Sequence, residues 1–223
     1  FVTGANDMVA IRLADFNLVG NQWRKSIEGD TILSISVVNI EDNPSYNSPP
    51  GVQRERDRSR PDQEIFRNEQ SLDLILNGLN PQESREAIKY LFRPLDVFNY
   101  SEMKLFVHGD STQLPGSVAY QYQPGLYSSE IYFRFGTDTN NYYEYRKPVE
   151  AGWQEISILF NQLTAIKQAR DSANSIFRLP VEGKPGHYYV VKGNATLTSV
   201  KFLSVGIHNT YPLEYDHQSS SMG

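Results

Sequence analysis

The sequence predicts a mainly β protein, an antiparallel β-sandwich of the jelly-roll or galactose-binding-like type with one or two short helices and a long irregular loop. Three observations lead to this prediction. Apolar and polar residues alternate with a period of two in several short segments, as in half-buried strands. Turn-forming residues separate these segments. Apolar residues at helical spacing are scarce.

Seven segments show this alternation. In 31–38, for example, Leu33, Ile35 and Val37 alternate with serines, so that the apolar side chains share one face. We therefore expect strands at 9–20, 31–38, 71–76, 103–108, 131–135, 155–160 and 200–207.

A hairpin is predicted in the aromatic region that begins at residue 132. Its tip runs from Asp138 to Asn141, residue types that favour tight turns, and 142–146 forms the returning strand. On that strand Tyr143 and Tyr145 fall on one face and Tyr142 on the other, and at least one face should be core.

Helical signal is limited to two places. The segment after Asn80 fits a turn or two of helix, and a short helix is expected from about Leu163 to Ala173. The expected organisation is a single sandwich domain over 1–223, interrupted by an irregular insertion at about 39–70.

The insertion from Asn39 to Gln70 has no apolar period, and such long loops are usually functional or disordered. Pro49-Pro50-Gly51 should form a rigid turn. The insertion is either a solvated surface loop or a segment that docks on another part of a larger protein. Its candidate interaction residues are Pro49, Pro50, Gly51, Arg54, Glu55, Arg56, Asp57 and Arg58.

Composition narrows the function classes. The net charge of −5 disfavours nucleic-acid binding, and the absence of Cys excludes disulfides and thiolate metal sites. No stretch approaches the roughly 20 apolar residues of a membrane helix. The chain begins at Phe1 without Met, so we expect it to be a fragment of a larger protein.

Catalytic signatures are absent from the sequence. The four histidines, at 108, 187, 208 and 217, lack metal-ligand spacing, and no GxSxG motif occurs. Among the carboxylates of the aromatic region, Glu144 is expected to point outward in a cross-strand ion pair, and Glu130, Glu150 and Glu155 form no evident acid–base pair. We predict no catalytic residue, no metal and no cofactor.

Two alternatives remain open at this point. Tyr142, Tyr122 and Tyr127 are candidates for an exposed aromatic surface, on which a carbohydrate-binding module would stack sugar rings. Tyrosine is also favoured in strands simply because it packs well there. A hydrolase domain is the third interpretation.

Six phrases carry a more specific signal, and they follow one another in a fixed order. They are LVGNQWR (18–24), NIEDNPSYNSPPGVQRERD (39–57), NEQSLDLILNGL (68–79), MKLFVHGD (103–110), YFRFGTDTNNYYEYRKPV (132–149) and GNATLTSVKFLSVGIHN (193–209). Because these six phrases occur in this order, the chain resembles the SprA/Sov family of very large outer-membrane proteins of Bacteroidetes.

The resemblance implies a role in protein export. Members of that family are linked to gliding motility and form the translocon of the type IX secretion system. This chain would be a soluble, non-enzymatic domain on the periplasmic or extracellular side of the outer membrane. Its partners would be other domains of the same large chain, other secretion-system subunits and secreted cargo. The family's recurrent phrases include here Trp23, Pro49, Pro50, Gly51, Arg54, Glu55, Asn68, Glu69, Gln70, Gly136, Tyr142, Tyr143, Glu144, Tyr145, Gly152 and Trp153.

One departure concerns the C-terminal end. After the GIHN phrase the family continues into a phrase resembling VWVNELR, whereas this chain continues with TYPLEYDHQSSSMG. The resemblance therefore leaves the C-terminal domain boundary undefined.

Overall fold

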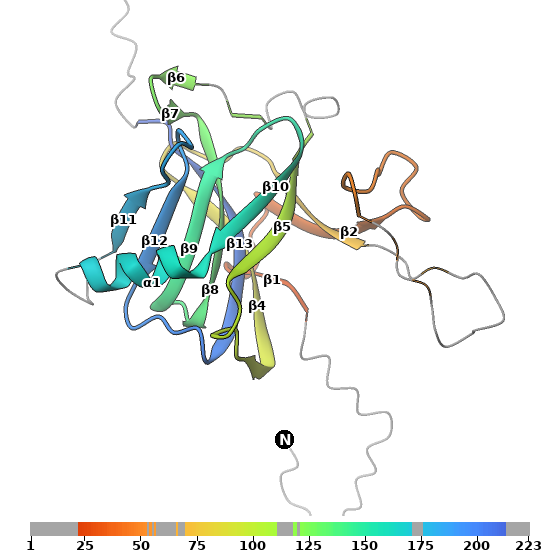
Figure 1. Cartoon of the computed structure of the whole chain (residues 1–223). Helices are drawn as coiled ribbons and strands as arrows, with labels where there is room; N and C mark the ends of the chain where they lie inside the picture. Colours follow the sequence, from red (N-terminus) through yellow and green to blue (C-terminus); the bar gives the residue numbers. More distant parts are fainter. Residues whose placement is uncertain are drawn as a thin grey trace, which may run out of the picture.

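The alternating segments form strands that pair into one large antiparallel sheet and three small ones (Figure 1). The structure is a computed structural model, and it describes residues 22–52, 54, 56, 66, 70–110, 118–119, 121–170 and 176–212. The large sheet has seven strands. In spatial order they are β1 (Arg24–Lys25), β4 (Ser84–Leu95), β13 (Val200–Asn209), β8 (Ser129–Asp138), β9 (Asn141–Pro148), β12 (Tyr188–Lys192) and β11 (Phe177–Pro180).

The hairpin β8–β9 forms the middle of this sheet, and its turn lies where the sequence predicts it. Asp138 is paired with Asn141, and the Asp138 carboxylate accepts a hydrogen bond from the backbone N–H of Asn140 at 2.8 Å. Gly136 lies opposite Tyr142, and a Cβ at Gly136 would lie 2.1 Å from the Asn141 carbonyl oxygen. A glycine is therefore required at this close approach.

One face of the large sheet, called here the inner face, carries the hydrophobic core. Phe135, Tyr143, Tyr145 and Val191 are at most 2% exposed on this face. A second layer covers them. It consists of the two-stranded ribbon of β5 (Glu102–Gly109) and β10 (Gly152–Leu159), together with α1 (Phe160–Ala169).

The helix α1 begins directly after β10 and packs on β12 and β11. Its residues Phe160, Leu163 and Ile166 are buried, and their spacing of three residues places them on one side of the helix. The expected helix is confirmed, but it begins three residues earlier than predicted, because Phe160 closes the core from the first turn. Residues 171–173 of the predicted helix lie outside the described residues.

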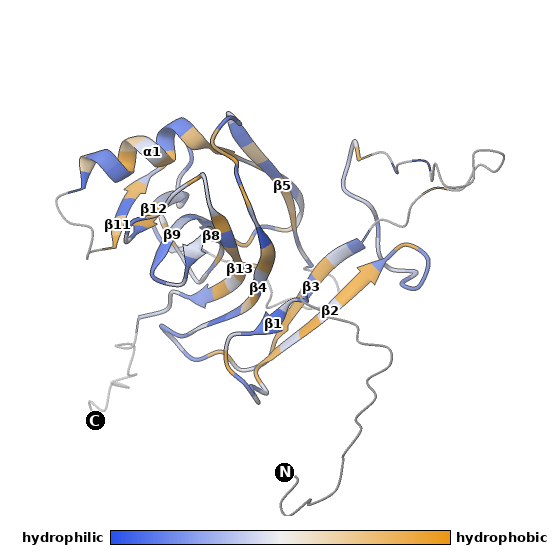
Figure 2. Ribbon diagram, turned by 90° about the horizontal axis from the view of Figure 1, so that it is seen from below, coloured by the Kyte–Doolittle hydropathy of each residue, from blue (hydrophilic) through white to orange (hydrophobic). Residues whose placement is uncertain are grey.

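A second ribbon lies beyond β5 (Figures 1 and 2). It pairs β2 (Leu33–Asn39) with β3 (Gln70–Leu76), and Asn39 lies directly opposite Gln70. The irregular insertion predicted at 39–70 is therefore the connection between two paired strands. A small ribbon of β6 (Gln121–Gln123) and β7 (Leu126–Tyr127) precedes β8.

The mainly β, antiparallel class is confirmed, with a second layer smaller than the first. The helical turns expected after Asn80 are wrong, because only a tight turn from Asn80 to Glu83 occurs there and β4 follows it. Pairing with β1 and β13 on both sides overrides the weak helical pattern of this segment. The strand expected at 9–20 lies outside the described residues.

We predict that Tyr143→Ala lowers the free energy of unfolding by about 3–5 kcal/mol, because it removes a large aromatic side chain from the core. Tyr100→Ala is the matched control, since Tyr100 is 66% exposed. Urea denaturation of both variants measures the difference. Equal losses of stability would show that Tyr143 is not a core residue.

Candidate functional site

A groove of about 930 Å³ opens on the inner face, between the β5–β10 ribbon and the β2–β3 ribbon. Its floor is the large sheet itself. Ile131 and Phe133 of β8, Val205 and Ile207 of β13, and Tyr145 of β9 line it. The volume lies within the roughly 300–1,000 Å³ of ligand-binding clefts.

The two walls of the groove are strand edges. Residues 105–110, at the end of β5, line one side, and residues 70–74 of β3 line the other. Side chains of a strand alternate between its faces, so a run of consecutive lining residues means that the edge of the strand faces the groove. Among the described strands, β5 pairs only with β10 and β3 only with β2.

The first part of the insertion, residues 43–52, connects the two walls and is called here the roof loop. The Tyr46 hydroxyl is 2.6 Å from the Ser71 hydroxyl of β3, and the Tyr46 ring meets Trp153 of β10 edge-on at 6.3 Å. Trp153 donates its Nε1–H to the Asn47 carbonyl at 3.0 Å, and its ring lies 4.9 Å from His108. The roof loop is thus anchored on its own chain.

Pro49, Pro50 and Gly51 form the turn that the sequence predicts. Val52 donates its backbone N–H to the Pro49 carbonyl at 3.2 Å, and Gly51 has a φ of 82°. This is a type II turn, with proline and glycine at the two central positions that favour them. Pro49 is buried in the groove lining, whereas Pro50 and Gly51 are exposed.

The charged part of the candidate interaction loop is described only in part. Arg54 pairs with Glu41 at 3.1 Å, and Arg56 forms an isolated bridge with Phe66. Glu55, Asp57 and Arg58 lie outside the described residues. The docking of this loop on another domain stays a prediction, while its first half packs on β3 and β10.

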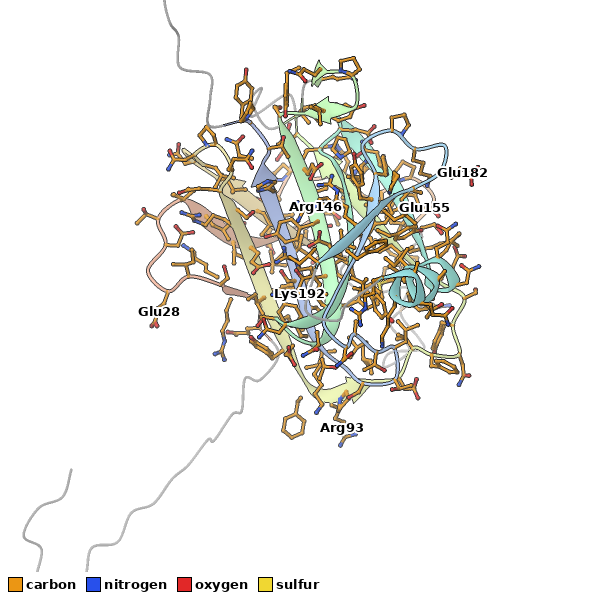
Figure 3. All side chains as sticks on the ribbon, turned by 90° about the vertical axis from the view of Figure 1, so that its left-hand side faces the viewer. Glu28, Arg93, Arg146, Glu155, Glu182 and Lys192 are labelled. Atoms are coloured by element: carbon orange, nitrogen blue, oxygen red, sulfur yellow. The ribbon has the colours of Figure 1, made fainter. Side chains whose placement is uncertain are left out.

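The opposite face of the large sheet, called here the outer face, carries a chain of charged side chains, of which Figure 3 labels Arg146. Glu144 is its centre. Its carboxylate accepts from Arg134 at 2.5 Å and from Arg146 at 2.8 Å, and only 1% of its side chain is exposed. Arg134 also binds Glu86 of β4, at 2.8 Å.

The chain of charges continues toward the β11 edge. Arg146 and Arg178 both donate to Glu130, at 3.3 and 3.0 Å, so the alternating charges connect β4, β8, β9 and β11. Burial acts to lower the pKa of the Arg134 guanidinium, but Glu144 and Glu86 outweigh it and raise that pKa overall. The pKa of Arg146 is raised in the same way, by Glu144 and Glu130 against burial.

Tyrosine rings lie beneath these arginines. The Arg134 guanidinium is 4.1 Å from the centre of the Tyr132 ring and 4.9 Å from that of Tyr142. Such stacking supplies cation–π attraction in addition to the ion pairs. Tyr142 is only 5% exposed as a result, so the predicted exposure of Tyr142 is wrong.

The three predicted surface tyrosines do not meet. Tyr142 lies opposite Gly136 at one end of β8, whereas Tyr127 precedes Ser129 at the other end. Tyr122 is half-buried, and its hydroxyl donates to the Thr210 carbonyl at 3.2 Å. These residues therefore form no continuous aromatic surface on which a sugar would stack.

The four glutamates of the aromatic region, Glu130, Glu144, Glu150 and Glu155, are all paired with cations. Besides the outer-face pairs, Lys147 binds Glu150, and Lys104 lies 3.3 Å from Glu155. The predicted cross-strand pair of Glu144 is confirmed with Arg134, but Glu144 is buried rather than exposed. No group of three or more His, Asp or Glu suited to a metal ion occurs among the described residues.

The described histidines make structural contacts. His187 Nδ1 is 2.7 Å from the Tyr145 hydroxyl, and burial, with the nearby Lys147 charge, lowers the pKa of His187 to about 4. His208 Nδ1 is 2.9 Å from the Ser84 hydroxyl. His217 lies outside the described residues.

Sequence reasoning missed most of the outer-face chain of charges. Arg134 and Arg146 occupy outward positions of the predicted hairpin, and this alternation was the available signal. Glu86 lies in a segment expected to be partly helical, and Arg178 lies in β11, which has no clear alternating pattern. The groove also had no sequence signal, since it combines residues far apart in the chain.

Comparison with protein families identifies the family of this chain. A family model, SprA_N, described as motility related/secretion protein, matches residues 1–221. The chain belongs to this family. No curated protein matches the chain. The SprA/Sov resemblance is thereby confirmed, and family membership relates the chain to motility and secretion.

The described helix is too short and too polar to cross a membrane.

We predict that Glu144→Gln lowers the free energy of unfolding by about 3 kcal/mol, because it leaves two partly buried arginines without their shared carboxylate. Glu155→Gln is the matched control. Its ion pair with Lys104 is about half exposed and screened by water, so its loss should lower the free energy of unfolding far less. Urea unfolding at neutral pH compares the two, and equal effects would contradict the central role of Glu144.

We predict that Trp153→Ala frees the roof loop, because the ring contacts Tyr46 and His108 and donates to Asn47. The expected loss of stability is about 2 kcal/mol. Amide exchange within residues 43–52 should become faster, while Trp23→Ala, whose ring lies 5.9 Å from the ammonium of Lys89 in β4, leaves it unchanged. Unaltered exchange in Trp153→Ala would show that other contacts hold the loop.

Proposed function

We propose that this chain is a non-enzymatic interaction domain of a large outer-membrane protein-secretion channel, the type IX translocon that also serves gliding motility. The observation that carries the proposal is the family match over residues 1–221, which relates the chain to motility and secretion. The six ordered phrases shared with SprA/Sov proteins support the narrower assignment to type IX secretion.

The state of the ionisable side chains supports a role without catalysis. A general acid or base needs a side chain that can take up or release a proton near the working pH. Here Glu130 and Glu144 are tied to arginines, and the low pKa of His187 keeps its ring neutral. In the part of the chain that the structure describes, these groups stabilise the fold.

The surfaces of the domain support a role in protein–protein contact. The β5–β10 and β2–β3 ribbons each have an edge directed at the groove, and such edges readily pair with other polypeptide. Pro50 and Gly51 present the exposed tip of the roof loop. The partners that we propose are other domains of the same large chain and other secretion-system subunits, with secreted cargo as a further partner.

The proposed location is the bacterial cell envelope, at the outer membrane. Family membership supports it, because secretion and surface motility both require proteins of the envelope. A carbohydrate-binding role finds less support. Its platform required Tyr142 at the surface, and this side chain is buried beneath Arg134.

The direct test uses an antibody raised against residues 22–212 to probe fractionated cells of the source organism. The proposal predicts a very large antigen in the outer-membrane fraction. A modest antigen in the soluble or secreted fraction would refute it. Fractions should be verified with known soluble and outer-membrane proteins.

The role of the insertion is tested separately in the parent protein. Deletion of residues 53–62 should leave the melting temperature of the domain unchanged and reduce secretion. A matched control removes charges from another exposed turn, with Glu182→Ala and Lys184→Ala together. Normal secretion by the deletion variant would exclude the insertion as a docking segment.

A further inference from the structure

A cluster of exposed apolar side chains lies where β4 ends and the chain turns toward β5. Residues 90–100, called here the tip, contain five large apolar side chains with exposed fractions between 49% and 83%: Tyr90, Phe92, Leu95, Phe98 and Tyr100. Single exposed apolar residues are common on protein surfaces, but a contiguous patch of this kind marks an interaction site. The tip is therefore a candidate contact surface.

The backbone of the tip is held in place by hydrogen bonds. Val97 donates its N–H to the Leu197 carbonyl at 2.8 Å, and Tyr100 donates its N–H to the Val97 carbonyl at 3.1 Å. The Asp96 carboxylate accepts a hydrogen bond from the backbone N–H of Phe98 at 3.0 Å. The exposed rings thus belong to a fixed turn, and their exposure is a property of the fold.

An irregularity in β4 contributes to this exposure. Tyr90 and Leu95 both pair with β13, but the residues between them lie opposite a single residue of β13, Lys201. Extra residues in one strand bend it and increase its twist. Phe92 belongs to this irregular stretch, and 83% of it is exposed.

The apolar surface continues from the tip onto the second layer. Phe98 and Tyr100 line a hollow of about 370 Å³ together with Leu159 and Leu197. Leu159, the last residue of β10, is itself 36% exposed. The patch therefore extends from the end of β4 across the turn to β10.

The charges at the tip are mainly positive, although the whole chain has a net charge of −5. Arg93 is exposed, and Figure 3 shows it at one extremity of the molecule, pointing away from the body. Lys201 is a second exposed cation beside the irregular stretch. Asp96 is the one acidic residue between 90 and 100, and its carboxylate is bonded to the Phe98 N–H. The tip is thus suited to an apolar partner with negative charge.

We propose that the tip binds the surface of a lipid bilayer with anionic headgroups. Apolar rings at a projecting end can enter the boundary between headgroups and acyl chains, while cations beside them attract anionic headgroups. A bilayer accepts a projecting end such as Arg93 and its neighbours directly, whereas a protein partner would need a matching hollow. The proposal stands on the tip alone and does not depend on the proposed role in secretion.

Binding in this orientation leaves the groove accessible. The tip leads into Glu102, the first residue of β5, whereas the groove is lined by residues 105–110 at the other end of that strand. A domain held to a bilayer by the tip would therefore keep both strand edges of the groove free for polypeptide.

The test measures sedimentation of the full chain with vesicles of phosphatidylethanolamine and phosphatidylglycerol. Phe92→Ser with Phe98→Ser should weaken binding by about tenfold or more, because the two rings no longer enter the bilayer. Ile176→Ser with Leu179→Ser is the matched control. These residues are 60% and 43% exposed and lie at the β11 edge of the large sheet, so binding should be unchanged.

A second pair of substitutions tests the charges without touching the rings. Arg93→Glu with Lys201→Glu should remove the preference for these vesicles over vesicles of phosphatidylcholine, and higher salt should reduce that preference in the unaltered chain. All replaced side chains are exposed, so urea unfolding should match that of the unaltered chain.

Three results would overturn the proposal. They are no binding of the unaltered chain to anionic vesicles, equal binding by the two serine double variants, and no effect of the charge reversal. Gel filtration examines self-association in parallel. A concentration-dependent dimer that is lost in Phe92→Ser with Phe98→Ser, without vesicle binding, would assign the tip to a second copy of the chain instead.

Discussion

The register of β8 against β9 is the constraint on which the rest of the molecule depends. It places Tyr143 opposite Phe135 on the inner face and Glu144 opposite Arg134 on the outer face. A slip of one residue would exchange the two faces, so that charged groups would enter the core and aromatic rings would leave it. The turn at Asp138 and the close approach at Gly136 hold this register at one end of the hairpin.

The outer face shows how a sheet can bury charge without a second hydrophobic layer. Each guanidinium shields a tyrosine ring below it and satisfies carboxylates beside it. Buried ion pairs often contribute little net stability compared with apolar residues of similar volume. Their value here is geometric, because the pair of Glu144 with Arg134 joins β9 to β8 and depends on the alignment that places these two residues opposite each other.

The two faces also differ in what they offer to other polypeptide. The outer face has its charges paired with one another, and this leaves little unsatisfied hydrogen-bonding capacity in the central strands. The inner face contains a groove, which has strand edges on both walls and an apolar floor. For a member of a motility and secretion family, contacts through main-chain pairing are therefore better placed in the groove than on the outer face.

The sequence by itself determined the period-two strands among the described residues, the turn at Asp138 and the family, because these depend on neighbouring residues or on ordered phrases. Only the tertiary structure decided that 84–95 is a strand, since its partners β1 and β13 lie far away in the chain. The burial of Tyr142 and Glu144 likewise could not be predicted from the local sequence pattern. Both occupy the outward face of β9, where alternation predicts exposure, and both are covered by Arg134 from the neighbouring strand. Alternation assigns a side chain to a face, but the packing of that face depends on long-range contacts.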